Sequence, residues 1–500
     1  MNVVFRVDAS LLIGSGHVMR CLVLADELER AGHRCVFACT PLEGDMRAFI
    51  TDSGFSVVTL AAPKTVIQAQ SDADYGTWLQ KTIEDDAKNF LEKVHSADLV
   101  VTDHYAIGKK WQSKVVQSIN CRLLAIDDLA REHCADLVLD QTLGRSRGDY
   151  SSSSNSVLAG SEYALLKPAF SRLREEALSR ALPTTPIRIL VSMGGVDAPN
   201  ATLEVLKSLC SHVQAHFTVL LSRRAPHYKQ VSNWCKQRYD VTHLDFVSDM
   251  ATLMLEHDVA IGAPGTSSWE RACLGLPNII VPLADNQTLV SEQLVKYGAA
   301  VKVDLENIST EIQSAYEAVC NDWHEMKGAN LALCDGLGVR RVTLEMEQLF
   351  SSNREHLSLV RATPSDIETV YHWQCHPKTR EYALNPRVPT WSEHSAWMEK
   401  KLRTASDYFY MVTHSTISEK VGVLRLDRIE PNHYLVSIFV NPECYGQGIA
   451  TQALQLIDAL HPELTLHATV LKANSASKRL FENARYQQVD EENYIRKPIC

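Results

Sequence analysis

The chain has 500 residues, of which 45% are hydrophobic and 22% are charged, and its net charge is −10. This composition is typical of globular protein, and the length corresponds to about three domains of 100–200 residues. The acidic balance argues against a broad basic surface for nucleic acid. No apolar run approaches the ~20 residues of a membrane span, and the start MNVVFRVDAS lacks the features of a signal peptide, so no membrane association is expected.

The cysteines favour a reducing compartment. The chain has 13 of them, scattered and without a CxxC pair. In a chain of this length such a distribution fits reduced thiols better than a disulfide framework, and it argues against a structural zinc site. We therefore expect a cytoplasmic protein.

The first part of the chain alternates short β-rich runs with helical patterns. Asn2–Val7 is a predicted strand. His17–Arg30 places its apolar residues on one helical face, and Gly32 suits the C-cap. Further buried strands are predicted at Arg34–Cys39, Ser56–Leu60, Leu99–Thr102 and Arg122–Ile126. This alternation predicts a parallel sheet with helices on both faces.

The alternation stops near Ala181–Pro186 and then restarts, with predicted strands at Ile187–Ser192, Phe217–Leu221, Val259–Ile261 and Asn278–Pro282. We therefore predict two similar α/β domains, 1–183 and 184–350, that face a cleft. A polar stretch at Ser351–His356 marks the next break. Consecutive strands then follow at Tyr408–Thr413, Val421–Asp427 and Tyr434–Val440, which predicts a separate α+β domain over 357–500.

A small-residue segment joins the first strand to its helix, from Asp8 through Gly14 and Gly16 to His17. Glycines let a ligand approach the backbone, and a helix N-terminus attracts anions. The third glycine of a dinucleotide fingerprint is replaced by Met19, which excludes an NAD site. A histidine at a helix N-terminus is kept neutral and can accept a proton. Two interpretations of His17 remain open: a general base, or a local hydrogen-bonding partner.

A second segment, GAPGTSSWE, follows the strand Val259–Ile261. Gly265 and the hydroxyls of Ser267 and Ser268 could cradle a diphosphate, and Glu270 could accept hydrogen bonds from a ribose diol. An ordinary N-cap with a first-turn glutamate fits the same residues. The next strand is followed by Asp285-Asn286-Gln287, which could line the same cleft.

Seven motifs occur in order: FRVDASLLIGSGHVMRC, DHYAIGKKW, AIDDLA, LVLDQT, EYALLKPAF, LVSMGGVD and GAPGTSSWERACLGLP. Together they make residues 1–350 resemble the UDP-2,4-diacetamido-2,4,6-trideoxy-β-L-altropyranose hydrolases of pseudaminic acid biosynthesis. The resemblance implies a GT-B-like pair of Rossmann-like domains facing a cleft, and hydrolysis with inversion at the anomeric carbon, without a metal.

The same resemblance implies roles for individual residues. His17 would be the base that activates water. The residues implied to bind the substrate are Asp8, Gly16, Tyr105, Gly265, Ser267, Ser268, Glu270 and Asn286. Asp127 and Asp128 are less specific, since they follow a strand and could cap the next element. Asp72-Ala73-Asp74 is formally a DxD motif, but it lies in a polar stretch and is assigned no metal.

The last domain contains a strand ending at Val440, a glycine-rich turn and a helix. Such a turn can bind a pyrophosphate, although an ordinary strand–helix turn is equally compatible. Together with LVRAT, the Trp391/His394/Trp397 cluster and Asn474, it makes residues 357–500 resemble the GNAT N-acetyltransferases. The resemblance implies that acetyl-CoA is bound by Val440, Gln447, Gly448, Ala450 and Asn474.

Two positions depart from the GNAT pattern. Tyr445 replaces the usual Arg or Gln at the start of the pyrophosphate motif. Phe481 occupies the position of the tyrosine that often protonates the leaving thiolate, so the general acid is left open, with Tyr486 as a neighbouring substitute. Arg361 and the Trp391/His394/Trp397 cluster resemble acetyltransferases of 4-amino sugar nucleotides, although core packing explains Trp397 equally well.

The two resemblances predict one bifunctional enzyme that acetylates a UDP-4-amino sugar and then hydrolyses the acetylated product to free sugar and UDP. The alternatives are a GT-B glycosyltransferase, which would need an acceptor sugar, and a non-catalytic sugar-nucleotide-binding protein with a CoA-binding domain.

Overall fold

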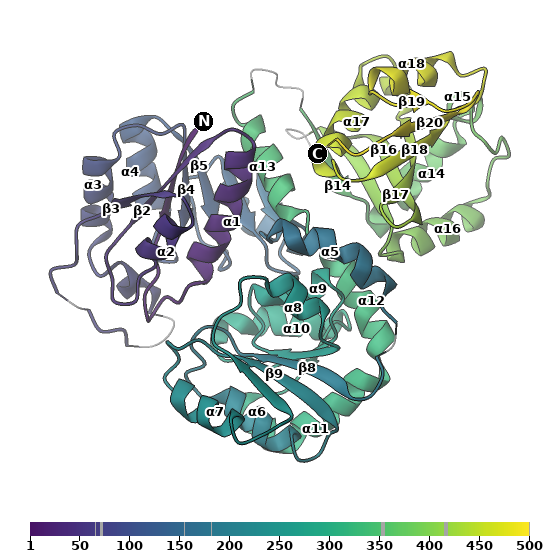
Figure 1. Ribbon diagram of the computed structural model, residues 1–500. Coiled ribbons are helices and arrows are strands. Elements are labelled where there is room, and N and C mark those ends of the chain that lie inside the picture. The colour runs from purple at the N-terminus through teal and green to yellow at the C-terminus, as the bar shows by residue number, and fades with distance from the viewer. Residues whose placement is uncertain are drawn as a thin grey trace. The chain divides into compact units, whose positions relative to one another are not determined.

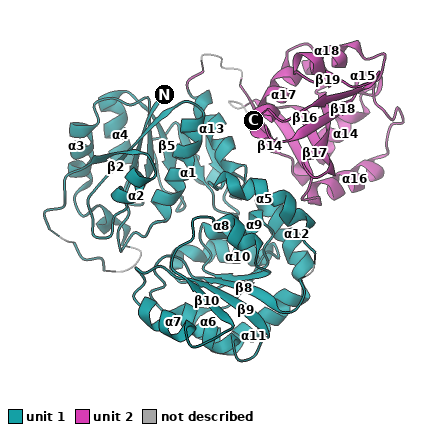
Figure 2. Ribbon diagram, in the orientation of Figure 1, with its two compact units in different colours: residues 1–349 teal, residues 350–500 magenta. Residues whose placement is uncertain are grey.

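The computed structural model describes residues 1–65, 67–70, 74–154, 156–181, 183–351, 356–414 and 419–499. The chain forms two compact units, Met1–Leu349 and Phe350–Cys500 (Figure 2). The break predicted over Ser351–His356 falls at this division, and its residues 352–355 lie outside the described part, as does residue 182 in the break at Ala181–Pro186.

The first sheet is parallel throughout, with the strand order β3-β2-β1-β4-β5-β6-β7. Its strands are β1 Asn2–Val7, β2 Arg34–Cys39, β3 Ser56–Thr59, β4 Leu99–Asp103, β5 Arg122–Ile126, β6 Leu137–Asp140 and β7 Val157–Ala159. Its helices are α1 Gly16–Arg30, α2 Arg47–Asp52, α3 Ile83–Lys93 and α4 Lys109–Ile119. The predicted parallel sheet is thus confirmed, and β6 and β7 extend it beyond the strands predicted from the sequence.

Helix α1 shows why this part of the chain folds as predicted. Val18, Cys21 and Leu28 are fully buried against the sheet, and Gly32 adopts a φ of +85° just after the helix, a backbone region that favours glycine. The helix begins one residue earlier than predicted, at Gly16, so its first turn lies at the carboxyl end of β1.

The second sheet is also parallel, with the order β10-β9-β8-β11-β12-β13. Its strands are β8 Ile187–Ser192, β9 Ala215–Leu220, β10 Val241–Leu244, β11 Val259–Gly262, β12 Asn278–Ile280 and β13 Val301–Lys302. The following helices accompany it: α5 Pro168–Ser179, α6 Ala201–Leu209, α7 Tyr228–Cys235, α8 Met250–Leu255, α9 Ser267–Cys273, α10 Thr288–Lys296, α11 Ile308–Asn321 and α12 Trp323–Leu333.

Helix α13, Gly338–Gln348, returns to the first sheet and lies beside α1 (Figure 1). Its residues Val339, Val342 and Met346 belong to the same apolar core as α1 and β1. The last helix of the first unit therefore joins the two sheets, although the predicted range 184–350 placed it with the second.

The second unit is a mixed sheet of the order β14-β15-β16-β17-β18-β20-β19. Its strands are β14 Leu357–Arg361, β15 Tyr408–His414, β16 Lys420–Glu430, β17 His433–Val440, β18 Thr465–Thr469, β19 Gln487–Gln488 and β20 Asn493–Arg496. Its helices are α14 Ile367–Cys375, α15 Pro377–Arg380, α16 Trp391–Arg403, α17 Ile449–Leu460 and α18 Ser475–Asn483.

Strands β17 and β18 run parallel but pair only from His433 to Leu435. The remainder of β17, up to Val440, is therefore not paired with β18. Backbone groups of a strand must be satisfied by some partner, so this separation leaves hydrogen-bonding groups for another molecule.

Candidate active site

A cleft of about 540 Å³ lies within the first unit, lined by loops that follow strands of both sheets. From the first sheet's side come Gly16 and His17, at the start of α1, and Tyr105, after β4; from the second sheet's side come Gly265 and Asn286. In open α/β sheets ligands bind at the carboxyl ends of the strands, because the loops and free helix N–H groups meet there. The structure thus brings five of the predicted site residues to one cavity.

His17 is held by a buried carboxylate. Its Nδ1 lies 2.6 Å from Oδ1 of Asp103, the last residue of β4. Burial alone would raise the pKa of Asp103, but the Arg20 guanidinium and His17 outweigh it, and the pKa lies well below its usual range. An ionised Asp103 can only accept, so Nδ1 carries a hydrogen, and in the neutral imidazole Nε2 is then the acceptor. This is the arrangement of an oriented general base.

Arg20 extends this pair into a network. Its Nε lies 2.6 Å from Asp103 Oδ2, and its Nη1 lies 2.8 Å from Asp128 Oδ2. Asp128 also accepts from the hydroxyl of Tyr105 at 2.7 Å. Burial, followed by Asp128, raises the pKa of Tyr105, so this phenol stays protonated and keeps donating.

Aromatic rings surround the imidazole. The His17 ring lies edge-on to Tyr105 with centroids 4.7 Å apart, and edge-on to Trp78 at 5.7 Å. Trp78 stacks on Tyr105 at 5.1 Å, and Tyr75 contacts both. These rings limit the rotation of His17, because any other rotamer would have to displace them.

A buried arginine holds the loop before α9 in place. Arg271 donates to Ser267 Oγ at 3.3 Å, to Ser268 Oγ at 3.0 Å and to the Ala263 carbonyl at 3.1 Å. Burial lowers the pKa of Arg271 to about 10. Because a guanidinium can only donate, both serine oxygens act as acceptors here, and their O–H groups are free to donate to another molecule. Sequence reasoning did not single out Arg271.

The predicted nucleotide residues do not all reach the cleft. Gly265 and Asn286 line it, whereas Ser267, Ser268 and Glu270 do not belong to its wall. Ser268 is buried and Glu270 is half-buried. Burial raises the pKa of Glu270 to about 7, against the opposing effect of Arg271. This carboxyl is therefore poised between its two protonation states near neutral pH.

Asp8 is placed away from the cleft wall. Its carboxylate is fully buried, accepts from the Thr40 backbone at 2.7 Å and pairs with Arg6 at 2.8 Å. Arg6 also pairs with Asp86, another fully buried group, at 2.7 Å. In the structure Asp8 thus belongs to a buried charged network at the end of β1. Its carboxylate stabilises the strand and does not point to a ligand.

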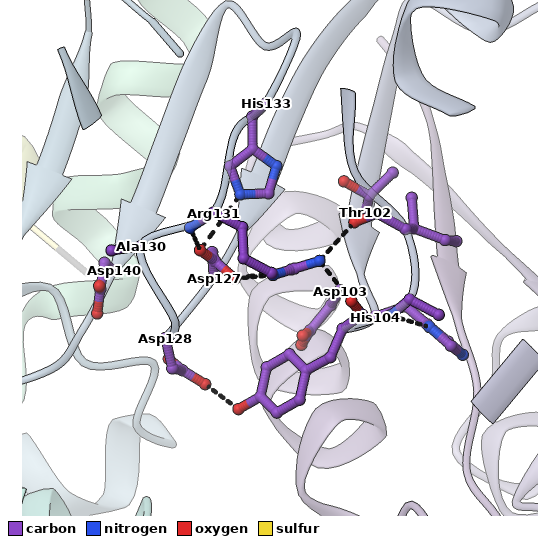
Figure 3. Close-up of polar contacts among 12 residues, drawn as sticks. Thr102, Asp103, His104, Asp127, Asp128, Ala130, Arg131, His133 and Asp140 are labelled. Carbon is purple, nitrogen blue, oxygen red and sulfur yellow. Dashed lines mark hydrogen bonds and ion pairs between the residues drawn. The ribbon is translucent and has the colours of Figure 1, made fainter. Parts of the chain in front are cut away.

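Within the described residues no group of three His, Cys, Asp or Glu side chains could hold a metal ion. Asp72 of the DxD sequence lies outside those residues. The Asp127 carboxylate pairs with Arg131 at 2.7 Å and lies 3.3 Å from His133, and Figure 3 shows both side chains directed at it. Over the same part of the chain, no helix has both the length and the apolar character of a membrane span.

In the second unit, the glycine-rich turn connects β17 to α17. Gly446 and Gly448 have φ values of +82° and +77°, and Gly448 is the N-cap of α17. At these angles a side chain would strain the backbone, so glycine is required for this turn. A Cβ added at Gly448 would meet no described atom within 4 Å, so the space beside the helix N-terminus is open. The turn can therefore receive an anion.

Asn474 caps α18, where its side chain accepts from the Ser477 N–H at 3.0 Å. Phe481 is buried at 4% exposure and packs edge-on against Tyr486, which is equally buried. Burial raises the pKa of the Tyr486 phenol. The structure thus places the proposed substitute acid inside the core of the unit.

The aromatic cluster predicted on α16 has two kinds of member. Trp391 is 48% exposed and lies edge-on to Tyr371 at 5.2 Å. His394 is buried and hydrogen-bonds to the Ile367 carbonyl. Trp397 packs against the core, with the Arg425 guanidinium 4.9 Å from its ring centroid. Trp391 is therefore the member available to a ligand.

Two protein-family models match the chain. Residues 189–329 match the glycosyltransferase family 28 C-terminal domain, and residues 356–487 match the acetyltransferase (GNAT) domain. These segments cover the second sheet of the first unit and most of the second unit. The GNAT match supports the use of acetyl-CoA.

Known proteins resemble the chain as well. An uncharacterized protein of Methanocaldococcus jannaschii is 21% identical, with 98% of this chain and 97% of the relative covered. The UDP-2,4-diacetamido-2,4,6-trideoxy-β-L-altropyranose hydrolase of Campylobacter jejuni is 24% identical, with 60% and 99% covered. The solved structure of the kitacinnamycin glycotransferase is 14% identical, with 70% and 98% covered and a TM-score of 0.53, which shows the GT-B fold.

These matches fit a hydrolase-like region fused to a GNAT domain. They confirm the predicted GT-B-like pair of Rossmann-like domains followed by a GNAT domain. They support a sugar-nucleotide-processing enzyme with an acetyltransferase domain.

Proposed function

We propose that the first unit hydrolyses UDP-2,4-diacetamido-2,4,6-trideoxy-β-L-altropyranose, and that the second unit makes this compound by acetylating the corresponding UDP-4-amino sugar with acetyl-CoA. The observation that carries the proposal is the His17–Asp103 pair at the wall of the cleft. The similarity to the Campylobacter jejuni hydrolase over 60% of the chain supports the choice of substrate.

In the proposed reaction His17 Nε2 takes a proton from a water molecule as its oxygen attacks the anomeric carbon. The bond from that carbon to the UDP oxygen breaks, and UDP leaves with the bonding electrons. Attack from the side opposite UDP inverts the configuration. Asp103 stabilises the imidazolium that forms, because its charge lies 2.6 Å from Nδ1.

The departing UDP needs donors for its negative charge. The loop around Gly265 reaches the cleft, and we propose that its backbone N–H groups at the start of α9 bind the diphosphate; the hydroxyls of Ser267 and Ser268 lie behind this wall. Asn286 lies on the same side of the cleft. Fixed donors of this kind stabilise charge without reorganising during the reaction, so we propose that no divalent metal takes part.

In the second unit we propose that acetyl-CoA binds between the separated ends of β17 and β18, with its pyrophosphate at the turn of Gly446–Gly448. Val440, Gln447, Gly448 and Ala450 would supply the contacts. The amine of the sugar nucleotide attacks the acetyl carbonyl, the carbon–sulfur bond breaks, the new amide nitrogen gives up one proton to solvent, and the leaving thiolate takes one proton from solvent.

The test is to incubate the protein with the UDP-4-amino sugar and acetyl-CoA while following free thiol and UDP. We expect thiol to appear first and UDP to follow, with free diacetamido sugar as the other product. UDP release that requires an added sugar acceptor would identify a glycosyltransferase, and the absence of both products would leave a binding protein.

A further inference from the structure

Two polar side chains on the wall of the cleft after β6 take no part in the proposed hydrolysis. Gln141 and Arg145 both line the cleft, and both belong to the loop that follows Leu137–Asp140. Gln141 is only 3% exposed. A buried amide at a ligand site is held in one orientation by its partners, so its remaining groups show what it offers to a ligand.

The orientation of Gln141 follows from one contact. Its Oε1 lies 3.1 Å from the backbone N of Leu165, and a backbone N–H can only donate. The amide NH₂ is thus the other end of the side chain, and among the described residues no hydrogen bond engages it. Gln141 therefore presents a donor.

Arg145 is held in a similar way. Its Nε lies 2.7 Å from the fully buried Asp140, and its Nη2 lies 3.1 Å from the Asp128 carbonyl. These contacts leave N–H groups of the guanidinium for the cleft. Asp128 also pairs with Arg20, which holds Asp103 and so His17. Arg145 is thus connected to the proposed base by continuous contacts.

The hydrogen-bond donors on this wall favour a ligand acceptor. Arg20 is shared between the Asp128 and Asp103 carboxylates, and the Asp140 carboxylate is paired with Arg145. The exposed carboxylates of Asp285, just before α10, and of Glu292, on α10, also line the cleft. The charges of the cleft therefore do not decide between an amine and an amide. The Gln141 NH₂ and the Arg145 guanidinium decide, because they need an acceptor, which an amide carbonyl offers and an ammonium ion lacks.

We propose that Gln141 and Arg145 form a donor subsite that binds the carbonyl of an acylamino group, and that the first unit thereby selects an N-acylated sugar nucleotide over the free amine. The inference rests on the proposed hydrolysis and adds a specificity rule to it. Acylation turns an ammonium group, which can only donate, into a neutral amide with a carbonyl acceptor. An acylation reaction must therefore precede hydrolysis of this substrate.

The experiment compares UDP release from the diacetamido UDP-sugar and from its analogue with a free 4-amine. For the wild-type protein we expect a ratio of kcat/KM of at least about 100 in favour of the acylated substrate, since donors built for a carbonyl are left unpaired by an amine. Release from neither substrate would overturn the proposed hydrolysis itself. Equal release from both would overturn only the donor subsite.

The decisive variant is Gln141→Glu. One carboxylate oxygen still accepts from Leu165, while the other replaces the donor with an acceptor of nearly the same shape. We expect the ratio to fall at least about 10-fold, through slower release from the acylated substrate and faster release from the amine. Arg122→Gln, at the start of β5 and outside the cleft, is the matched control and should leave the ratio unchanged.

Calorimetric affinity for UDP, whose proposed contacts lie on loops of the second sheet, reports whether the variant is folded. If Gln141→Glu binds UDP as the wild type does and loses activity equally toward both substrates, Gln141 does not select the acyl group and the proposal is wrong.

Discussion

Replacing Asp103 by asparagine tests whether His17 acts as an oriented base. Asp103 Oδ1 lies 2.6 Å from His17 Nδ1, and Arg20 donates to both carboxylate oxygens. Asparagine keeps the shape but turns one acceptor into an N–H donor. Where that donor faces Nδ1, the imidazole carries its hydrogen on Nε2, which can no longer accept a proton from water; where it faces Arg20 Nε instead, the negative charge that stabilises the imidazolium is still lost.

The expected loss of kcat and of stability follows from these contacts. A misdirected imidazole removes general-base catalysis, which is worth about 10²–10⁴ in kcat, or about 2.7–5.5 kcal/mol of barrier. KM should change little, because Asp103 does not line the cleft. Breaking a buried ion pair costs about 3–5 kcal/mol of stability, and since Asp128 still pairs with Arg20 we expect the lower end of that range.

The assay is UDP release at saturating UDP-sugar, measured well below the melting temperature of the variant. Acetylation by the same sample is the internal control for intact protein. Asp136→Asn is the matched control, because Asp136 pairs with the exposed Arg122 rather than with the network of the cleft. A folded Asp103→Asn variant with kcat within about threefold of wild type would refute the reasoning.

Further predictions concern the nucleotide, the cofactor and the metal. In a His17→Asn background, affinity for the UDP-sugar should rise with pH through about 7, because the ionised Glu270 accepts from a diol better than the protonated form. Glu270→Gln should remove this pH dependence, which calorimetry from pH 6 to 8 measures. Gly448→Val should raise KM for acetyl-CoA at least about 10-fold while UDP release is unchanged. Gly298→Val, at a similar positive φ in the first unit, is the control for backbone strain caused by valine at such an angle. Exhaustive EDTA treatment should leave UDP release intact; recovery by magnesium of a lost activity would contradict this.

Much of the first unit could be predicted because parallel strands buried on both faces appear as apolar runs. Asn2–Val7 and Ile187–Ser192 have the bounds expected from the sequence. Val157–Ala159 was missed because three residues give no periodicity. The packing of α13 on the first sheet was missed too. An amphipathic pattern predicts a helix with one buried face, but it does not indicate against which sheet that face packs.

The site was predictable only for residues beside a recognisable turn. His17 follows glycines at a strand end, but its partner Asp103 lies 86 positions away and is joined to it only by the adjacency of β1 and β4. A usable signal existed, because Asp103 ends a buried strand, where the carboxyl edge of the sheet collects polar groups. Applied together with the expected strand order, that rule would have paired the two residues.

Arg20 and Arg271 show that a residue can shape the site without contacting the ligand itself. Both guanidiniums are buried, and the contacts described for them go to other site residues: Arg20 to Asp103, and Arg271 to Ser267 and Ser268. A guanidinium only donates, so each fixes which atoms of its partners remain free: an ionised carboxylate for the imidazole, and the serine hydrogens. Arg20 thus supports the acceptor that the proposed reaction needs at the cleft wall, the His17 Nε2, whereas Arg271 acts behind the opposite wall and holds the loop that carries Gly265 into the cleft.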